Sequence, residues 1–180
     1  QNFISSDLSV FNIPQTLTLT RKTENKKYIN LDYTQYYNNL EVIDSRLYAK
    51  FSLDHQLVAF GLDVFSDISI GIIPSISQTD AINSASQNIS SPVFDTSVED
   101  DLKILPVPRN NKYEYHLVYT VRVSTKLTHG PADYICYVDA NNGELLMRIN
   151  TVLYEAPPVA NVHVEGEVYT THPYNPSSVE

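Results

Sequence analysis

Residues 26–65, KKYINLDYTQYYNNLEVIDSRLYAKFSLDHQLVAFGLDVF, constrain the fold more than any other part of the chain. Apolar and polar residues alternate along three segments of this stretch, which is the period of two of a half-buried β-strand. We expect these strands at 28–37, 40–53 and 56–65. Turns at Asn38-Asn39 and at 54–56 join them, because Asn and Asp tolerate the positive φ of tight hairpins. The residues expected on the apolar face of the second strand are Leu47, Ala49, Phe51 and Leu53.

This antiparallel meander needs a partner to cover its apolar face. Residues 17–21 alternate in the same way and are expected to add a short strand to the meander, across the polar turn 22–27. Residues 3–11 hold scattered apolar side chains and resemble one incomplete amphipathic segment. Two covers are therefore open: a helix at the N-terminus, or a second layer formed by the rest of the chain.

The strongest helix signal lies in the second half, at 77–89. Ser77 and Asp80 have the spacing of a capping box, in which two side chains satisfy free N–H groups of the first turn. Four apolar residues recur on one face at helical spacing. They are Ala81, Ile82, Ala85 and Ile89.

Strands are expected on the C-terminal side of this helix. Residues 102–108 are apolar but contain Pro106 and Pro108, which predicts an edge strand. Residues 113–125 alternate cleanly, and 134–139 and 144–153 flank a tight turn at 140–143. The segments 90–101 and 126–133 are expected to be loops. The predicted fold class is α+β, with two small antiparallel sheet layers and one clear helix that covers the second layer.

Composition agrees with a strand-rich fold and disfavours two classes of partner. The chain has 13 Tyr, one Met and no Trp, and Ile, Val, Thr and Ser are abundant. Its formal net charge of −9 argues against binding nucleic acid or an anionic membrane surface. No apolar run reaches the length of a membrane span. Because the sequence begins at Gln1, we expect that a targeting segment has been removed, and the single Cys fits either a cytosolic or an exported bacterial protein.

Residues that could carry catalysis or bind metal are scattered. None of the histidines has zinc-ligand spacing to another His or to a Cys, and the group His163, Glu165 and His172 is a weak hint of a metal site. Cys136 lies inside an apolar alternating run, where a thiol is usually a small buried hydrophobe. The acidic group Asp95, Glu99, Asp100 and Asp101 lacks the ordered spacing of a calcium loop. We therefore predict no catalytic, cofactor-binding or metal-binding residues in this chain.

Two stretches nevertheless resemble known modules. Residues 33–60 resemble the fungalysin/thermolysin propeptide (FTP) motif through a Q-x-Y motif (Gln35 and Tyr37), Val42 and the two turns, although Asn39 and Gln56 stand where Gly is common. Residues 76–144 are similar to a PepSY domain. The residues that carry this second likeness are Ile76, Ser77 and Ala81, then an L-x-Y-x-V motif (Leu117, Tyr119 and Val121), then a V-D-A-x-x-G-E motif (Val138, Asp139, Ala140, Gly143 and Glu144). Residues 164–176, VEGEVYTTHPYNP, resemble the junction that follows such propeptides.

This resemblance implies the prodomain of a secreted zinc metallopeptidase, which acts as intramolecular chaperone and inhibitor of a catalytic domain in the same precursor. It also implies an extracellular or periplasmic location after removal of a signal peptide. It implies an FTP-like domain at 1–72, a PepSY-like domain at 73–155 and a proline-rich linker at 156–180. The zinc would belong to the catalytic domain, and the partner would be that domain in cis. Tyr36, Tyr48 and residues 159–169 are the candidates for the surface that faces the peptidase.

Two other classes of function stay open. Small α+β layers of this kind also serve as free-standing extracellular binding or adhesion modules. An enzyme whose site escapes sequence reasoning is the second alternative. A coding sequence that continues into H-E-x-x-H would favour the prodomain, and chelator-sensitive peptidase activity of the chain itself would favour the enzyme.

Overall fold

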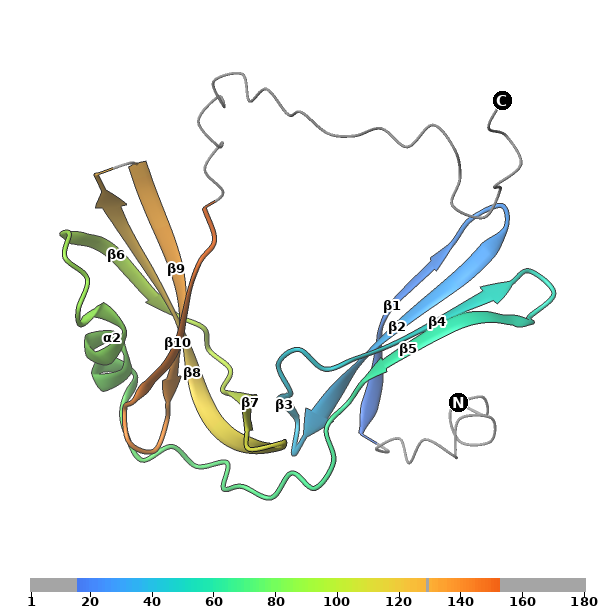
Figure 1. Ribbon diagram of the computed structural model, residues 1–180, viewed down its shortest axis with the longest axis horizontal. Helices are drawn as coiled ribbons and strands as arrows, with labels where there is room; N and C mark the ends of the chain where they lie inside the picture. The colour runs from blue at the N-terminus through green and yellow to red at the C-terminus, as the bar shows by residue number, and fades with distance from the viewer. Residues whose placement is uncertain (1–15, 129, 153–180) are drawn as a thin grey trace, which may run out of the picture.

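The computed structural model describes residues 16–128 and 130–152, and within them the chain forms two antiparallel sheets and one helix. In Figure 1 the two sheets diverge from a joint at β3 and β7, and helix α2 lies on the face of the second sheet that points away from the first. This arrangement confirms a strand-rich α+β fold with two sheet layers.

The first sheet has the strand order β1-β2-β4-β5, and β3 pairs with β2. Its strands are β1 (Leu17–Glu24), β2 (Tyr28–Tyr37), β3 (Leu40–Glu41), β4 (Arg46–Ser52) and β5 (Leu57–Asp63). The register places Leu47 between Tyr33 of β2 and Leu62 of β5. The predicted meander is therefore present, with β1 added along its first strand.

The two turns of the meander form as their sequences predict. Asn38 and Asn39 have φ values of 47° and 68°, and Tyr37 pairs with Leu40 directly across them. Positive φ at both central residues is the requirement of a type I′ hairpin, which Asn meets at low cost. In the second turn the residue with positive φ is His55, at 64°.

The single strand expected at 40–53 is wrong, because the chain breaks between β3 and β4. Asp44 has a φ of 60°, and Ser45 turns back to donate its backbone N–H to the carbonyl of Val42 over 3.2 Å. At the other end β4 stops at Ser52, whose hydroxyl accepts the N–H of Gln56 over 3.1 Å and closes the turn. Leu53 is consequently 48% exposed, so the expectation that it faces a core is wrong.

The second sheet has the strand order β10-β9-β8-β6, and β7 also pairs with β8. Its strands are β6 (Val93–Val98), β7 (Lys103–Arg109), β8 (Lys112–Leu127), β9 (Gly130–Asp139) and β10 (Leu145–Asn150). β6 and β7 lie end to end along one side of β8, which confirms the proline-containing strand as an edge strand. Residues 90–101 are not all loop, because 93–98 form β6, and 126–133 are largely strand, because β8 and β9 extend into them.

Helix α2 (Gln78–Ser86) covers the second sheet and is shorter than the 77–89 expected. Its buried residues are Ala81 and Ala85, two of the four predicted. The helix ends because Gln87 is extended, with ψ of 147°. Arg148 of β10 then donates to the carbonyls of Ala85 and Gln87 over 2.7 and 2.8 Å, which satisfies acceptors that the helix end leaves free.

Leu47 and Ala49 form a small core on the first sheet and are 0% and 1% exposed. The partly buried residues packed against them come from β1, β2, β4 and β5 of the same sheet. Among the described residues, no side chain of the second sheet belongs to this core. The alternative cover, residues 3–11, lies outside the described residues.

The predicted capping box is confirmed: the backbone N–H of Asp80 donates to the Ser77 hydroxyl, and that of Ser77 donates to the Asp80 carboxylate. The Ser77 hydroxyl also lowers the pKa of Asp80 from its ordinary value of 3.8.

The substitution Ser77→Ala should lower the free energy of unfolding by about 1 kcal/mol at neutral pH, measured by thermal or urea unfolding. A lowered folded pKa means that the Asp80 contribution is present above the ordinary pKa and disappears as the pH falls through the folded value. The gap between Ser77→Ala and wild type should therefore narrow in strong acid, and a gap that stays constant there would contradict this role of Asp80.

Candidate functional site

The two sheets meet where Val42, just after β3, pairs with Ile104 of β7 in a parallel bridge. The N–H of Ile43 donates to the carbonyl of Ile104 over 2.9 Å. Val42 is fully buried and belongs to the same core as Leu117 and Val121 of the second sheet. A residue of the first layer thus completes the core of the second, which makes the joint part of both.

Gln35, the Gln of the Q-x-Y motif, fastens the segment that leaves the first sheet. Its side chain is 2% exposed, accepts the backbone N–H of Phe65 over 2.9 Å and donates to the Phe65 carbonyl over 2.7 Å. Its own N–H donates to the hydroxyl of Ser45, and its carbonyl accepts from Val42. One glutamine therefore fixes both the break between β3 and β4 and the start of the connecting segment 64–76.

Tyrosines from both sheets hold this connecting segment along its length. The hydroxyl of Tyr37 donates to the carbonyl of Ile70, that of Tyr115 to Ser66 and that of Tyr119 to Ile76, over 3.4, 2.6 and 3.0 Å. The ring of Phe65 also meets that of Tyr113 edge to face, with centroids 4.9 Å apart. The Tyr of the Q-x-Y motif and the Tyr of the L-x-Y-x-V motif consequently share one structural task.

The V-D-A-x-x-G-E motif anchors the far end of the connecting segment. The carboxylate of Asp139, 4% exposed as a residue, accepts the N–H groups of Asn141 and Asn142 over 2.7 and 3.2 Å. Its other oxygen lies 2.7 Å from Nδ1 of His116. These contacts fix the turn between β9 and β10.

Ala140 and Gly143 of the same motif place that turn against the helix. Ala140 is fully buried, and its carbonyl accepts the N–H groups of Ser75 and Ile76, immediately before the helix cap. Gly143 has a φ of 77° and lies close to Ser84 of α2, where a Cβ would be 3.4 Å from the Ser84 hydroxyl. The motif therefore needs a small residue at Ala140 and a glycine at Gly143 so that the turn can pack closely against the helix and its cap.

The polar face of the first sheet brings acidic, cationic and tyrosine side chains together. Arg46 forms an ion pair with Asp32, and its guanidinium lies 5.2 Å from the ring of Tyr48. The ammonium of Lys50 lies 3.9 Å from the ring of Tyr28. Cations held over tyrosine rings are attracted by the negative face of the ring, by about 0.5–1 kcal/mol at exposed sites. We call this set of residues, Tyr28, Asp32, Arg46, Tyr48 and Lys50, the tyrosine–cation face.

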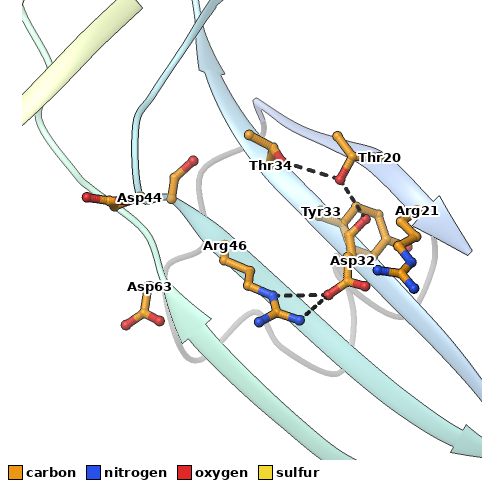
Figure 2. Close-up of a pocket in the computed structure, with 9 residues that line it drawn as sticks. Thr20, Arg21, Asp32, Tyr33, Thr34, Asp44, Arg46 and Asp63 are labelled. Carbon is orange, nitrogen blue, oxygen red and sulfur yellow. Dashed lines mark hydrogen bonds and ion pairs between the residues drawn. The ribbon is translucent and has the colours of Figure 1, made fainter. Parts of the chain in front are cut away.

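An open hollow of about 570 Å³ adjoins this face. Figure 2 shows the guanidinium of Arg46 pointing toward the carboxylate of Asp32 on the neighbouring strand, and the hydroxyl of Thr20 hydrogen-bonded to that of Thr34. The remaining residues of its lining are Arg21, Tyr33, Asp44, Ser45 and Asp63. Its three carboxylates and two guanidiniums nearly balance, so the hollow suits polar, mixed-charge contacts more than a single ion.

Tyr48 is held in place by a glycine on the neighbouring strand. A Cβ on Gly61 would lie 2.1 Å from Cε1 of Tyr48, so the ring lies against the backbone of β5. Tyr48 is still 41% exposed, which leaves part of the ring for a partner. Tyr36 lies on the same face of β2 and is partly buried.

The other sequence candidates do not gather into a site. Cys136 is fully buried, and burial raises the pKa of its thiol, with Arg148 partly opposing the shift. Asp95 lies on β6 rather than in a loop, and Glu99 pairs with Lys103 over 2.8 Å. His163, Glu165, His172 and the rest of 159–169 lie outside the described residues.

Sequence reasoning named Tyr48 but not its neighbours Arg46 and Lys50. The signal was available, because the alternation placed all three on the outward face of one strand. What it lacked was the cross-strand register that brings Arg46 near Asp32 and Lys50 near Tyr28.

Two further observations hold for residues 16–128 and 130–152. Nowhere in them do three or more His, Cys, Asp or Glu side chains gather as they would around a metal ion. Their one helix is also too short to cross a bilayer.

Comparison with known proteins gives a sparse result. No protein family model and no curated protein matches the chain. Among solved structures it is similar to the Bacillus megaterium YpeB C-terminal domain, at 12% sequence identity and a TM-score of 0.36. The match covers 81% of this chain and 61% of that one, so the chain spans less than two thirds of its neighbour. A likeness at this level carries no argument about function.

Proposed function

We propose that this chain is the N-terminal prodomain of a secreted zinc metallopeptidase. In this proposal an FTP-like layer (1–72) and a PepSY-like layer (73–155) act together as intramolecular chaperone and inhibitor, and 156–180 lead toward the catalytic domain. Catalysis and zinc belong to that domain, and this chain supplies neither. The protein acts outside the cytoplasm, after removal of a signal peptide.

The observation that carries the proposal is the position of the two motif sets. Gln35 and Tyr37 hold the connecting segment at Phe65 and Ile70, and Asp139 fixes the turn whose next residue, Ala140, binds the segment again at its far end. Residues that carry the resemblance therefore bind the segment that connects the two sheets at both of its ends, and so fix the two sheets relative to each other. A tandem propeptide needs this property, because both layers must present their surfaces together.

A scaffold of this kind can help another domain to fold in a simple physical way. Its partner-facing side chains are held before contact, so binding costs little conformational entropy. Exposed Tyr and Arg, as on the tyrosine–cation face, are also the residue types that contribute most binding energy at protein interfaces. This surface supports Tyr48 as a contact of the peptidase, and Tyr36, which pairs with Glu41 farther along β2, is the second candidate.

The first test is the coding sequence downstream of Glu180 together with a refolding assay. We expect a continuation that contains H-E-x-x-H. The catalytic domain, denatured and diluted into buffer, should recover more zinc-dependent activity when the 180-residue chain is present and later removed by proteolysis. A precursor with no peptidase domain would instead favour the free-standing binding module.

A matched pair of variants tests the tyrosine–cation face. Tyr48→Ala should weaken binding of the chain to the catalytic domain at least tenfold, about 1.4 kcal/mol, because it removes an exposed aromatic from the proposed contact. Phe94→Ala is the control, since Phe94 is 67% exposed but lies on β6 of the other sheet. Both variants are first checked by thermal unfolding, and binding is measured by surface plasmon resonance. Equal losses for the two variants would remove this face from the proposal.

A further inference from the structure

The connecting segment 64–76 is held near both of its ends but not in its middle. Phe65 and Ile70 are bound by side chains of the first sheet, and Ser75 and Ile76 by the turn between β9 and β10. Among the described residues, none forms a hydrogen bond with 71–74. Figure 1 shows this part of the chain crossing from β5 to α2 outside both sheets. The backbone groups of 71–74 can therefore bind another molecule without breaking a sheet.

The middle of the segment also exposes its apolar side chains. Ile73 is 81% exposed, the highest value for a large apolar residue in the described part of the chain, and Ile72 is 39% exposed. Gly71 is open as well, since a Cβ there would meet no atom within 4 Å. Ile68 and Ile70, by contrast, pack against the core of the second sheet. Exposed stretches without secondary structure are the preferred sites of proteolytic cleavage.

We propose that the Ile72–Ile73 bond is a cleavage site for an endopeptidase with an apolar specificity pocket. Such enzymes bind an extended chain through its backbone groups, and a pocket selects one side chain. An aliphatic side chain lies on each side of this bond, so a pocket on either side of the cut is filled. The next bond is a poor substrate, because Pro74 has no N–H.

The reaction is a hydrolysis that consumes one water molecule. The C–N bond between Ile72 and Ile73 breaks, the carbonyl carbon of Ile72 gains the hydroxyl of water, and the nitrogen of Ile73 gains the proton. The products end in a new carboxylate at Ile72 and begin with a new amino group at Ile73.

This cut turns the arrangement of the two sheets into an association of two separate chains. The hydrogen bonds of Gln35 and Tyr37 to the segment stay within the N-terminal product, and those of Ala140 stay within the C-terminal product. Only noncovalent contacts, among them the joint of Val42 and Ile104, then hold the products together. A short linker gives such a contact an effective concentration on the order of millimolar, which the cut removes. The stability of the two-sheet arrangement should then depend on dilution.

The hydrogen bond from Tyr37 to the carbonyl of Ile70 controls access to the cleavage site. A peptidase binds several residues on each side of the bond that it cuts, so Ile70 has to leave its partner first. At 3.4 Å this bond is the longest of the three that tyrosine hydroxyls make to the segment. Cleavage from a locally opened state follows the population of that state. Removing the hydroxyl of Tyr37 should therefore speed cleavage.

Limited digestion of the whole chain with subtilisin, followed by mass spectrometry, tests the proposal. Subtilisin is a serine peptidase with a broad apolar pocket, so the result does not depend on the proposed function. We expect the first cut within the described residues to lie between Ile72 and Ile73. Ile72→Asp should slow this cut at least tenfold, because an apolar pocket rejects a charge. Ile149→Asp is the matched control, since Ile149 is 45% exposed on β10 and should leave the rate unchanged.

Two further measurements test the access step and the effect of the cut. Tyr37→Phe should speed cleavage at least threefold, and Tyr134→Phe, on β9, should not. The urea midpoint of the cleaved protein should fall on dilution, whereas that of the intact chain should stay constant. Circular dichroism checks that all variants keep their fold. A first cut elsewhere in the described residues, equal rates for Ile72→Asp and Ile149→Asp, or an unchanged rate for Tyr37→Phe overturns the proposal.

Discussion

Replacing Gln35→Ala should lower the free energy of unfolding by about 3 kcal/mol, because it leaves both backbone groups of Phe65 without their partner. The loss follows from geometry: a 2% exposed side chain both donates to and accepts from one residue 30 positions away. Urea unfolding followed by far-ultraviolet circular dichroism measures the effect. The same unfolding can be followed by tyrosine fluorescence, since the chain has 13 Tyr and no Trp.

Two comparisons separate hydrogen bonding from packing in this prediction. Gln35→Met keeps the length of the side chain but loses both hydrogen bonds, so it should be destabilised nearly as much as Gln35→Ala. Gln78→Ala changes an exposed glutamine at the first position of α2 and should stay within about 0.5 kcal/mol of wild type. A fully stable Gln35→Met protein would show that the amide does not fasten the connecting segment.

Asp139→Ala should have an effect of similar size, about 3 kcal/mol, at the other end of the connecting segment. It removes the acceptor of the Asn141 and Asn142 N–H groups and the partner of His116. The turn that carries Ala140 then loses its fixed shape, and with it the hydrogen bonds to Ser75 and Ile76. We expect a lower urea midpoint, together with faster hydrogen exchange at Ser75 and Ile76.

The control for Asp139 is an aspartate outside the turn. Asp95→Ala removes an exposed carboxylate from β6 and should leave stability nearly unchanged. Asp139→Asn retains one side-chain oxygen and should lose less than Asp139→Ala. If Asp139→Ala and Asp95→Ala were equally stable, the motif would have no role in holding the two layers.

Local sequence determined the elements whose stabilising contacts are themselves local. The Asn38-Asn39 turn was predictable because two residues that tolerate positive φ sit between alternating strands. The capping box at Ser77 was predictable because both of its partners lie within four residues. Pro106 and Pro108 marked an edge strand because proline cannot donate to a ladder on both sides.

The misses arise where a distant partner decides the conformation. β6 contains Asp95, Thr96 and Ser97 and has a shift in its pairing register, so its alternation is weak, and only pairing with β8 makes it a strand. The break after Val42 looks like continuous strand in the sequence. The break forms because the backbone N–H of Gln35 donates to the hydroxyl of Ser45, and because Val42 is buried in the core of the second sheet.

The candidate surface was predictable only in part for the same reason. Alternation along β4 placed Tyr48 on the outward face, which the structure bears out. The role of Gly61 beneath the ring depends on the pairing of β4 with β5, and the partners of Arg46 and Lys50 depend on the pairing of β4 with β2. Register of this kind follows from the assembled sheet and not from the composition of a strand.

We propose that this two-sheet chain binds and restrains a catalytic metallopeptidase domain. The most direct measurement is a titration of the mature catalytic domain of the same precursor with the folded 180-residue chain, with zinc-dependent cleavage of a peptide substrate as the signal. We predict saturable inhibition by micromolar chain, weakened by Tyr48→Ala and not by Phe94→Ala. Full peptidase activity in the presence of excess folded chain would contradict the claim.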